Sequence, residues 1–337
     1  MTFTQATIVL NYVVDENVYS YFDQSINIWT MLCLSCFGVV TNVLNAVVFI
    51  RQGLKDSVSI SMMAITCWDL VKCLSGLIHR MYGPLQAISQ WVSHIWLTYT
   101  YHAEFNSIFA GFVSYALTAY VSVERCLCVS MPLKVRSIVT VKLTLFMVVA
   151  ISLLTFGAFF VVFFNFDIYY MYYSKFNATA PIFLYSTFYY RMQHFAIPYY
   201  SAMAIVLPFT SFIVLSISSS ITVYYLRKSS QFIGKTQSAS GISLRERRAS
   251  SMLLVIIAIK IGNLFPRMVV YSAQLVEPEF YSLRHYHYLF LTVTRFLFVL
   301  DFANAAVTFF IYLKMSSNFK ATFLSLCTRC LRSPSKS

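Results

Sequence analysis

The chain has 337 residues, of which 58% are hydrophobic and 11% are charged, and its formal net charge is +13. An average soluble domain has about 25% charged residues, and a soluble fold of this length could not bury so much apolar surface. Glycine (9) and proline (8) are too scarce for low-complexity sequence. The composition therefore predicts an integral membrane protein, because lipid can solvate an apolar exterior.

Seven apolar runs are each long enough to cross a bilayer as a helix, which takes about 20 residues. They are 27–50, 57–79, 95–128, 140–164, 198–226, 249–275 and 287–313. Backbone polar groups cannot stay open in lipid, so each run should be helical. Polar and apolar residues then alternate at helical spacing over 316–326, which predicts an amphipathic helix on the membrane surface. We therefore expect an all-α membrane protein, a seven-transmembrane-helix bundle (27–313) with a short amphipathic eighth helix.

The basic residues gather on one side of this bundle rather than in a nucleic-acid-binding patch. That side should be cytoplasmic by the positive-inside rule, with segment 1–26 extracellular and the tail 314–337 cytoplasmic, in the plasma membrane. The acids of the outer segments are Asp15, Glu16, Asp23, Asp167, Glu277 and Glu279. The basic residues of the inner side are Arg51, Lys55, Arg125, Lys134, Arg136, Lys142, Arg227, Lys228, Lys235, Arg245, Arg247, Arg248, Lys314, Lys320, Arg329, Arg332 and Lys336.

Two kinds of modification site follow from this topology. Asn177-Ala178-Thr179 is the only glycosylation acceptor sequence, and it lies in the outer segment 165–197. Cys327 and Cys330 follow the amphipathic segment and can be acylated there. None of the eight cysteines falls in an outer segment, so no disulfide framework is expected.

Characteristic polar residues and prolines recur through the runs in a fixed order. They are Asn42 in GVVTN, Asp69 in CWDL, Glu124-Arg125-Cys126, Pro132-Leu133 in CVSMPL, Pro208, Pro266 in NLFP, and Asn304 with Thr308-Phe309-Phe310-Ile311-Tyr312. In this order they resemble the rhodopsin-like family of G-protein-coupled receptors across 27–326, most closely the divergent invertebrate chemosensory and FMRFamide-peptide-type receptors.

The resemblance implies a receptor without enzymatic activity. It would bind an extracellular ligand, either a chemosensory small molecule or a short peptide, and activate a heterotrimeric G protein. In the family the arginine matched by Arg125 is held at rest by its neighbouring acid, here Glu124, and by the sixth helix, and a bend at Pro266 opens the inner side. The residues implied in coupling are Glu124, Arg125, Pro132, Leu133, Pro266 and Tyr312. The alternative for Glu124 and Arg125 is an ordinary interfacial ion pair.

Asp69 is a carboxylate near the middle of the membrane, where it needs a partner. Asn42, Ser114 and Asn304 match family positions that surround this acid and often hold a sodium ion. The sequence leaves two readings open, a sodium site and a protonated, hydrogen-bonded aspartic acid without an ion. No other cofactor and no metal cluster is expected.

The outer half of the bundle contains the candidate ligand-binding residues. Ser107 stands where amine receptors have an aspartate, so a monoamine ligand is not expected. The candidates are Arg80, Glu104, Ser107, Arg267 and Arg295. Our hypothesis is that Arg267, with Arg80 or Arg295, binds an acidic group of the ligand. The alternative is that these arginines pair internally with Glu104 or Asp301.

Several family features are absent. Thr100 replaces the cysteine that ties the third helix to the second outer loop, and that loop must be ordered by packing or be mobile. Leu264 replaces the tryptophan of the sixth helix, and Phe309 replaces the proline of the seventh. Because of these losses, the alternative function is that of a seven-helix protein whose G-protein coupling is lost or weak. A channel or transporter would need internal repeats and a path of ionisable residues, and we find neither in the sequence.

Overall fold

The computed structural model describes residues 14–131, 134–135, 138–233, 244–281 and 284–332. Within these residues, seven helices are long and apolar enough to cross a membrane, as predicted. Their spans are Glu16–Gln52, Ser57–Ile88, Gln90–Ser130, Val141–Phe164, Pro198–Lys228, Arg247–Val276 and His287–Met315. The chain is therefore a multi-pass membrane protein with a seven-helix bundle.

The helices follow the predicted order, and several are longer than their apolar runs. The first three spans comprise α1 (Glu16–Phe22), the π-helix η1 (Asp23–Thr30), α2 (Met31–Gln52), α3 (Ser57–Arg80), α4 (Tyr82–Ile88) and α5 (Gln90–Ser130). The other four comprise α7 (Val141–Gly157), the 3-10 helix η2 (Phe160–Phe164), α8 (Thr187–Ile233), α9 (Leu244–Val276) and α10 (His287–Met315). The amphipathic helix is α11 (Ser317–Arg332).

Local sequence signals explain where several helices begin and end. Asp56 accepts a hydrogen bond from the backbone N of Ser59 (2.8 Å) and caps α3, and Thr140 caps α7 in the same way at 3.2 Å. Gly53 ends α2 with φ 81°, a conformation that a residue without Cβ adopts freely.

The first helix begins well before the predicted run 27–50. Asp15 caps α1, so the last part of segment 1–26 is helical and continuous with the membrane span. Hydropathy missed this extension because it detects only the part of a helix that must lie in lipid.

The second outer segment contains the one departure from an all-α fold within the described residues. β1 (Phe166–Tyr173) pairs antiparallel with β2 (Ala178–Tyr185), so that Phe166 is opposite Tyr185. Aromatic residues favour such paired strands. Contacts between aromatic rings hold the hairpin against α5, and the ring centroids of Tyr101 in α5 and Phe183 in β2 are 4.2 Å apart. Packing therefore orders this segment where the family disulfide is missing.

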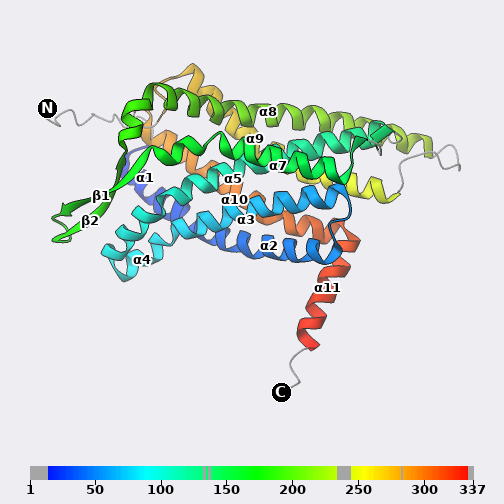
Figure 1. Cartoon of the computed structure of the whole chain (residues 1–337), viewed down its shortest axis with the longest axis horizontal. Helices are drawn as coiled ribbons and strands as arrows, with labels where there is room; N and C mark the ends of the chain where they lie inside the picture. Colours follow the sequence, from blue (N-terminus) through cyan, green and yellow to red (C-terminus); the bar gives the residue numbers. More distant parts are fainter. Residues whose placement is uncertain (1–13, 132–133, 136–137, 234–243, 282–283, 333–337) are drawn as a thin grey trace.

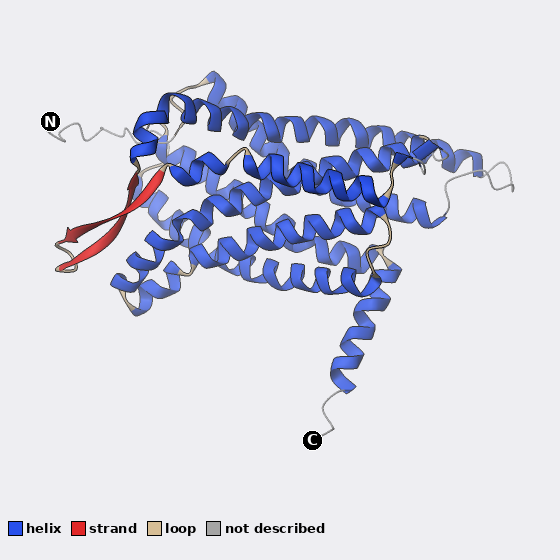
Figure 2. Cartoon of the chain, viewed as in Figure 1, coloured by secondary structure: helices blue, strands red, loops and turns tan. Residues whose placement is uncertain are grey.

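Figures 1 and 2 show the long helices lying side by side along the length of the molecule. The hairpin and α4 lie at one end, which we call the hairpin end, and α11 turns away from the bundle at the other, the α11 end. α5 packs against α3, α7, α8 and α9, so its side chains reach most of the bundle. This central position makes α5 a wall of both cavities described below.

Candidate functional site

A cavity of about 150 Å³ lies between α5, α8, α9 and α10. Aromatic and aliphatic side chains form most of its wall, and Arg267 contributes a charge. Tyr281, which lies outside the membrane spans, has a hydroxyl whose pKa is raised by desolvation above its ordinary, already basic value, so it presents a neutral donor to the cavity. The lining residues are Ile108, Phe112, Tyr200, Ser201, Ala204, Ile205, Arg267, Val270, Tyr271, Gln274, Tyr281, Phe290, Thr294, Leu297 and Phe298.

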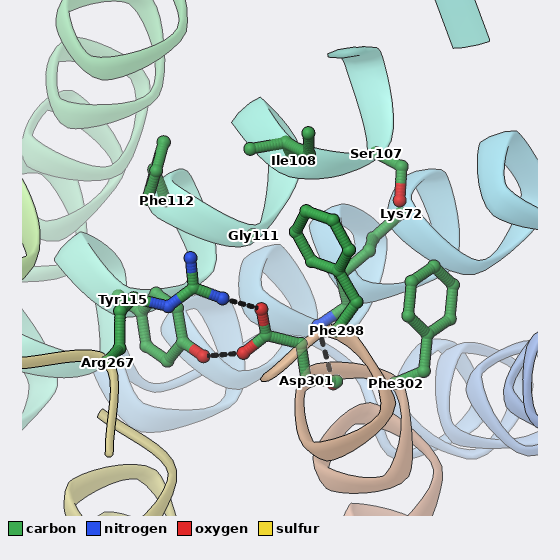
Figure 3. Close-up of a pocket in the computed structure, with 10 residues that line it drawn as sticks. All are labelled: Lys72, Ser107, Ile108, Gly111, Phe112, Tyr115, Arg267, Phe298, Asp301 and Phe302. Atoms are coloured by element: carbon green, nitrogen blue, oxygen red, sulfur yellow. Dashed lines mark hydrogen bonds and ion pairs between the residues drawn. The ribbon is translucent and has the colours of Figure 1, made fainter. Parts of the chain in front are cut away.

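A second cavity of about 10 Å³ adjoins the first and has room for roughly one water molecule. Its polar lining consists of Lys72, Ser107, Tyr115, Arg267 and Asp301 (Figure 3). Arg267 lines both cavities, together with Ile108, Phe112 and Phe298. The guanidinium of Arg267 is therefore the charged group that separates the larger cavity from the buried polar core.

Asp301 of α10 is the acceptor at the centre of that core. Its carboxylate pairs with Arg267 of α9 and accepts the hydroxyl hydrogen of Tyr115 of α5, as Figure 3 shows. The side-chain amide of Asn263 donates to the same carboxylate at 2.9 Å, and Lys72 donates to the backbone carbonyl of Asp301 at 3.2 Å. Four helices, α3, α5, α9 and α10, thus meet at one aspartate.

Asp69 of α3 has two lysine partners that sequence reasoning missed. Lys72 Nζ lies 3.1 Å from Asp69 Oδ1, and Lys260 Nζ lies 3.8 Å from Oδ2. Lys260 also donates to Ser114 Oγ at 3.0 Å and lies over the ring of Tyr115. The i, i+3 spacing of Asp69 and Lys72 in an apolar run was the available signal for the first partner.

The residues around Asp69 do not fit a sodium ion. The two ammonium groups already contact both carboxylate oxygens, and Lys260 also contacts Ser114, an expected sodium neighbour. Asn42 instead links α2 to α10 by donating to the carbonyl of Ala305 at 3.2 Å. The side-chain nitrogen of Asn304 is buried and has no partner among the described residues. From the sequence we considered a sodium site and a protonated aspartic acid at Asp69. The structure instead pairs this carboxylate with two lysines, which neither of those interpretations included.

The charged residues of the membrane region also form a more continuous series than we inferred. The series begins with Lys260, which contacts Asp69, and Asp69 contacts Lys72. Lys72 donates to the backbone carbonyl of Asp301, whose carboxylate pairs with Arg267. The expectation that ionisable residues form no such path was therefore wrong, because these residues belong to three helices, α3, α9 and α10, which converge only in the folded bundle.

The structure separates Arg267 from the other two arginines of our ligand hypothesis. Arg295 Nη1 lies 2.7 Å from Glu104 Oε1, and Arg80 Nη2 lies 3.9 Å from the same oxygen. Arg80 also donates to the backbone and side-chain oxygens of Asn27, which lies in the π-helix η1. Arg80, Arg295 and Glu104 do not line either described cavity, whereas Ser107 lines the smaller one. All three arginines thus pair internally with Glu104 or Asp301, as the alternative to our ligand hypothesis predicted.

A separate charged pair lies toward the α11 end. Glu124 accepts from Arg125 Nη2 at 2.6 Å and from the hydroxyl of Ser57, which itself accepts from Thr144 at 3.0 Å. Both charged residues are buried. Pro132 and Leu133 lie outside the described residues.

Two further residues of the coupling set are integrated in the helix packing. Pro266 lies inside α9, which continues past it. Tyr312 is buried at the end of α10, 3.1 Å from the sulfur of Met62, and its ring packs against Phe49 and Phe319.

The predicted modification sites lie at opposite ends. Asn177 is exposed in the hairpin turn with φ 48°, a conformation that asparagine tolerates. Cys327 is partly exposed on α11, and the side chain of Cys330 lies outside the described residues.

The seven membrane spans, the lined cavity and the buried Glu124–Arg125 pair describe a protein of the G-protein-coupled receptor class. A family model described as serpentine type 7TM GPCR chemoreceptor Srw matches residues 29–330. The chain therefore belongs to this chemoreceptor family, as its resemblance to invertebrate chemosensory receptors predicted. No curated protein matches the chain.

Proposed function

We propose that this chemoreceptor binds a small extracellular molecule in the cavity of about 150 Å³ and activates a heterotrimeric G protein at the α11 end. The hairpin end would face the extracellular space, and α11 would lie on the cytoplasmic leaflet of the plasma membrane. The match to the chemoreceptor family over residues 29–330 carries this proposal.

The cavity supports the ligand half of the proposal. Its wall combines aromatic rings with a few convergent polar groups, the usual composition of a small-molecule site. Its volume suits a compact molecule better than a peptide of several residues. α9 and α10 both contribute to the wall, so a ligand there would contact two helices that also extend to the α11 end.

The Glu124–Arg125 pair supports the coupling half. The two side chains are buried and joined at 2.6 Å, which is the contact between the arginine and its neighbouring acid that the family resemblance assigns to a resting receptor. A G protein would gain Arg125 as a contact only after this pair opens. The expected consequence is that Arg125 affects signalling far more than it affects ligand binding.

Cells that express wild type, Arg125→Ala and Arg51→Ala test the proposal. Arg51 is an exposed arginine at the same end and serves as the matched control. In a panel of small organic acids, amino acids and short amidated peptides, we expect one of the small molecules to drive G-protein activation in wild type and Arg51→Ala. Arg125→Ala should lose the response at equal surface level. An equal response in Arg125→Ala would contradict the role of Arg125, and silence of well-displayed wild type to the whole panel would favour a non-coupling seven-helix protein.

A further inference from the structure

Among the described residues, the buried and partly buried ion pairs of the bundle form three groups, and two of these are electrically balanced. Toward the hairpin end, Asp23 and Glu104 face Arg80 and Arg295, with His79 beside Glu104. Toward the α11 end, Glu124 faces Arg125. In both groups the number of carboxylates equals the number of Lys and Arg side chains.

By formal charge, the third group has one positive charge in excess. Within the described part of the chain, Lys72, Lys260 and Arg267 face two carboxylates, those of Asp69 and Asp301. The exposed fractions of the three cations are 3%, 1% and 5%, so water does not screen them. An uncompensated charge in a low-dielectric interior is strongly unfavourable, and an anion brought next to it is correspondingly stabilised.

Arg267 is the member of this group that an entering molecule can reach. It lines the cavity of about 150 Å³, whose described lining contains no acidic residue. One guanidinium nitrogen is directed at Asp301 and another points away from it (Figure 3). Among the described residues, its other side-chain hydrogen bond is a long one to Tyr271, at 3.3 Å, and its Nε has no hydrogen-bond partner. A guanidinium has five N–H donors, so capacity remains for an acceptor.

We propose that the ligand is a small monoanion, a carboxylate on an apolar or aromatic body, whose carboxylate accepts hydrogen bonds from Arg267 and supplies the missing negative charge. This inference rests on the proposed function for the location of the ligand. The aromatic wall, including Phe112, Tyr200 and Phe298, receives the body of the molecule. A cationic amine would add to the positive excess, and a neutral amide would leave it uncompensated.

Binding is measured as thermal stabilisation of the purified receptor in lipid nanodiscs, without a G protein. The probes are phenylacetate, 3-phenylpropionate and hexanoate, each with the primary amide and the primary amine of the same carbon skeleton. We expect at least one carboxylate to raise Tm, with its amide needing roughly tenfold higher concentration or more, equivalent to about 1.4 kcal/mol. Stabilisation by an amide or amine as strong as by its carboxylate, or by none of the carboxylates, would overturn the inference.

The variants Arg267→Gln and Arg284→Gln form a matched pair for the binding assay. Arg284 is exposed, pairs with Glu279 and lies outside the cavity lining. We expect Arg267→Gln to abolish the preference for carboxylate over amide and Arg284→Gln to keep it. An unchanged preference in folded Arg267→Gln would also overturn the inference.

A ligand-independent measurement tests the charge excess itself. Lys72→Met reduces the excess from one to zero, and Asp69→Asn increases it from one to two. We expect the Tm of the unliganded receptor to rise in Lys72→Met and to fall in Asp69→Asn. A fall in both variants would mean that the cluster is balanced without a ligand and would overturn the inference.

G-protein activation by the same probes separates this inference from the proposed function. Stabilisation by carboxylates without any activation would contradict coupling and leave the anion site intact. Activation that depends on Arg125 but is driven equally well by amides or amines would retain the receptor function and overturn the anion site.

Discussion

Lys260 Nζ of α9 lies 3.8 Å from Asp69 Oδ2 of α3 and 3.0 Å from Ser114 Oγ of α5. A cation covalently attached to α9 therefore occupies contacts that the resemblance assigned to a diffusible sodium ion. Because the ammonium belongs to the chain, it cannot dissociate when the salt concentration changes. It also links α9 to two helices on the other side of the polar core.

The first prediction concerns this substitution of lysine for sodium. We expect ligand responses of the wild type to be unchanged when sodium is replaced by choline at constant ionic strength. In the double variant Lys72→Met/Lys260→Met, Asp69 loses both partners and becomes available to an ion, so a sodium dependence should appear. A sodium-sensitive wild type with an insensitive double variant would contradict this account.

The second prediction concerns the ion pair between Arg267 and Asp301. Asp301→Asn leaves Arg267 buried without its counter-charge, and breaking such a pair typically costs roughly 3–5 kcal/mol. We expect a lower Tm and reduced surface display. The double variant Arg267→Met/Asp301→Asn removes both charges and should recover most of the loss. If the double variant is as unstable as the single one, the electrostatic explanation is wrong and the aspartate acts mainly through its bonds to Tyr115 and Asn263.

The third prediction concerns the resting state. Glu124→Gln removes the charge that holds Arg125 at 2.6 Å, and a hydrogen bond to a charged group is worth about 1.5–3 kcal/mol. We expect basal G-protein activation to rise by roughly tenfold or more. Ser57→Ala is the matched control, because it removes a hydrogen bond to Glu124 and keeps both charges. Equal basal activity in wild type and Glu124→Gln, at matched surface level, would argue against a resting role for the pair.

The fourth prediction concerns orientation. If the hairpin end is extracellular, the receptor carries a glycan at Asn177, which glycosidase treatment reveals as a mobility shift on a gel. Thr179→Ala destroys the acceptor sequence and should abolish the shift, whereas Thr179→Ser preserves the acceptor and the shift. Alanine and serine are both small at position 179 of the strand β2, so we expect the two variants to fold equally well. A shift that persists in Thr179→Ala would place the glycan elsewhere.

The seven spans could be read from the sequence because hydropathy is a local property. Each helix must satisfy its own backbone hydrogen bonds in lipid, and a run of about 20 apolar residues is enough to predict such a helix. The extension of α1 to Glu16 and the hairpin 166–185 were harder to foresee. Both lie beyond the apolar runs, where lipid does not require the backbone to be helical.

The family, too, was accessible from the sequence, because Asn42, Asp69, Arg125 and Pro266 recur in a fixed order. The partners of these residues were not. Lys260 had no explanation in the sequence, yet it proves to be the neighbour of Asp69 and Ser114. Arg267 was a candidate alongside Arg80 and Arg295, and the structure pairs Arg267 with Asp301 but both other arginines with Glu104.

The amino-acid sequence by itself determined the membrane location, the number of helices and the receptor family, since these depend on local composition and on the order of motifs. Only the tertiary structure decided which charges meet. Asp69 and Lys260 are 191 positions apart, and their contact depends on the rotation and depth of α3 and α9 within the bundle. Those are set by the packing of all seven helices, which no single segment encodes.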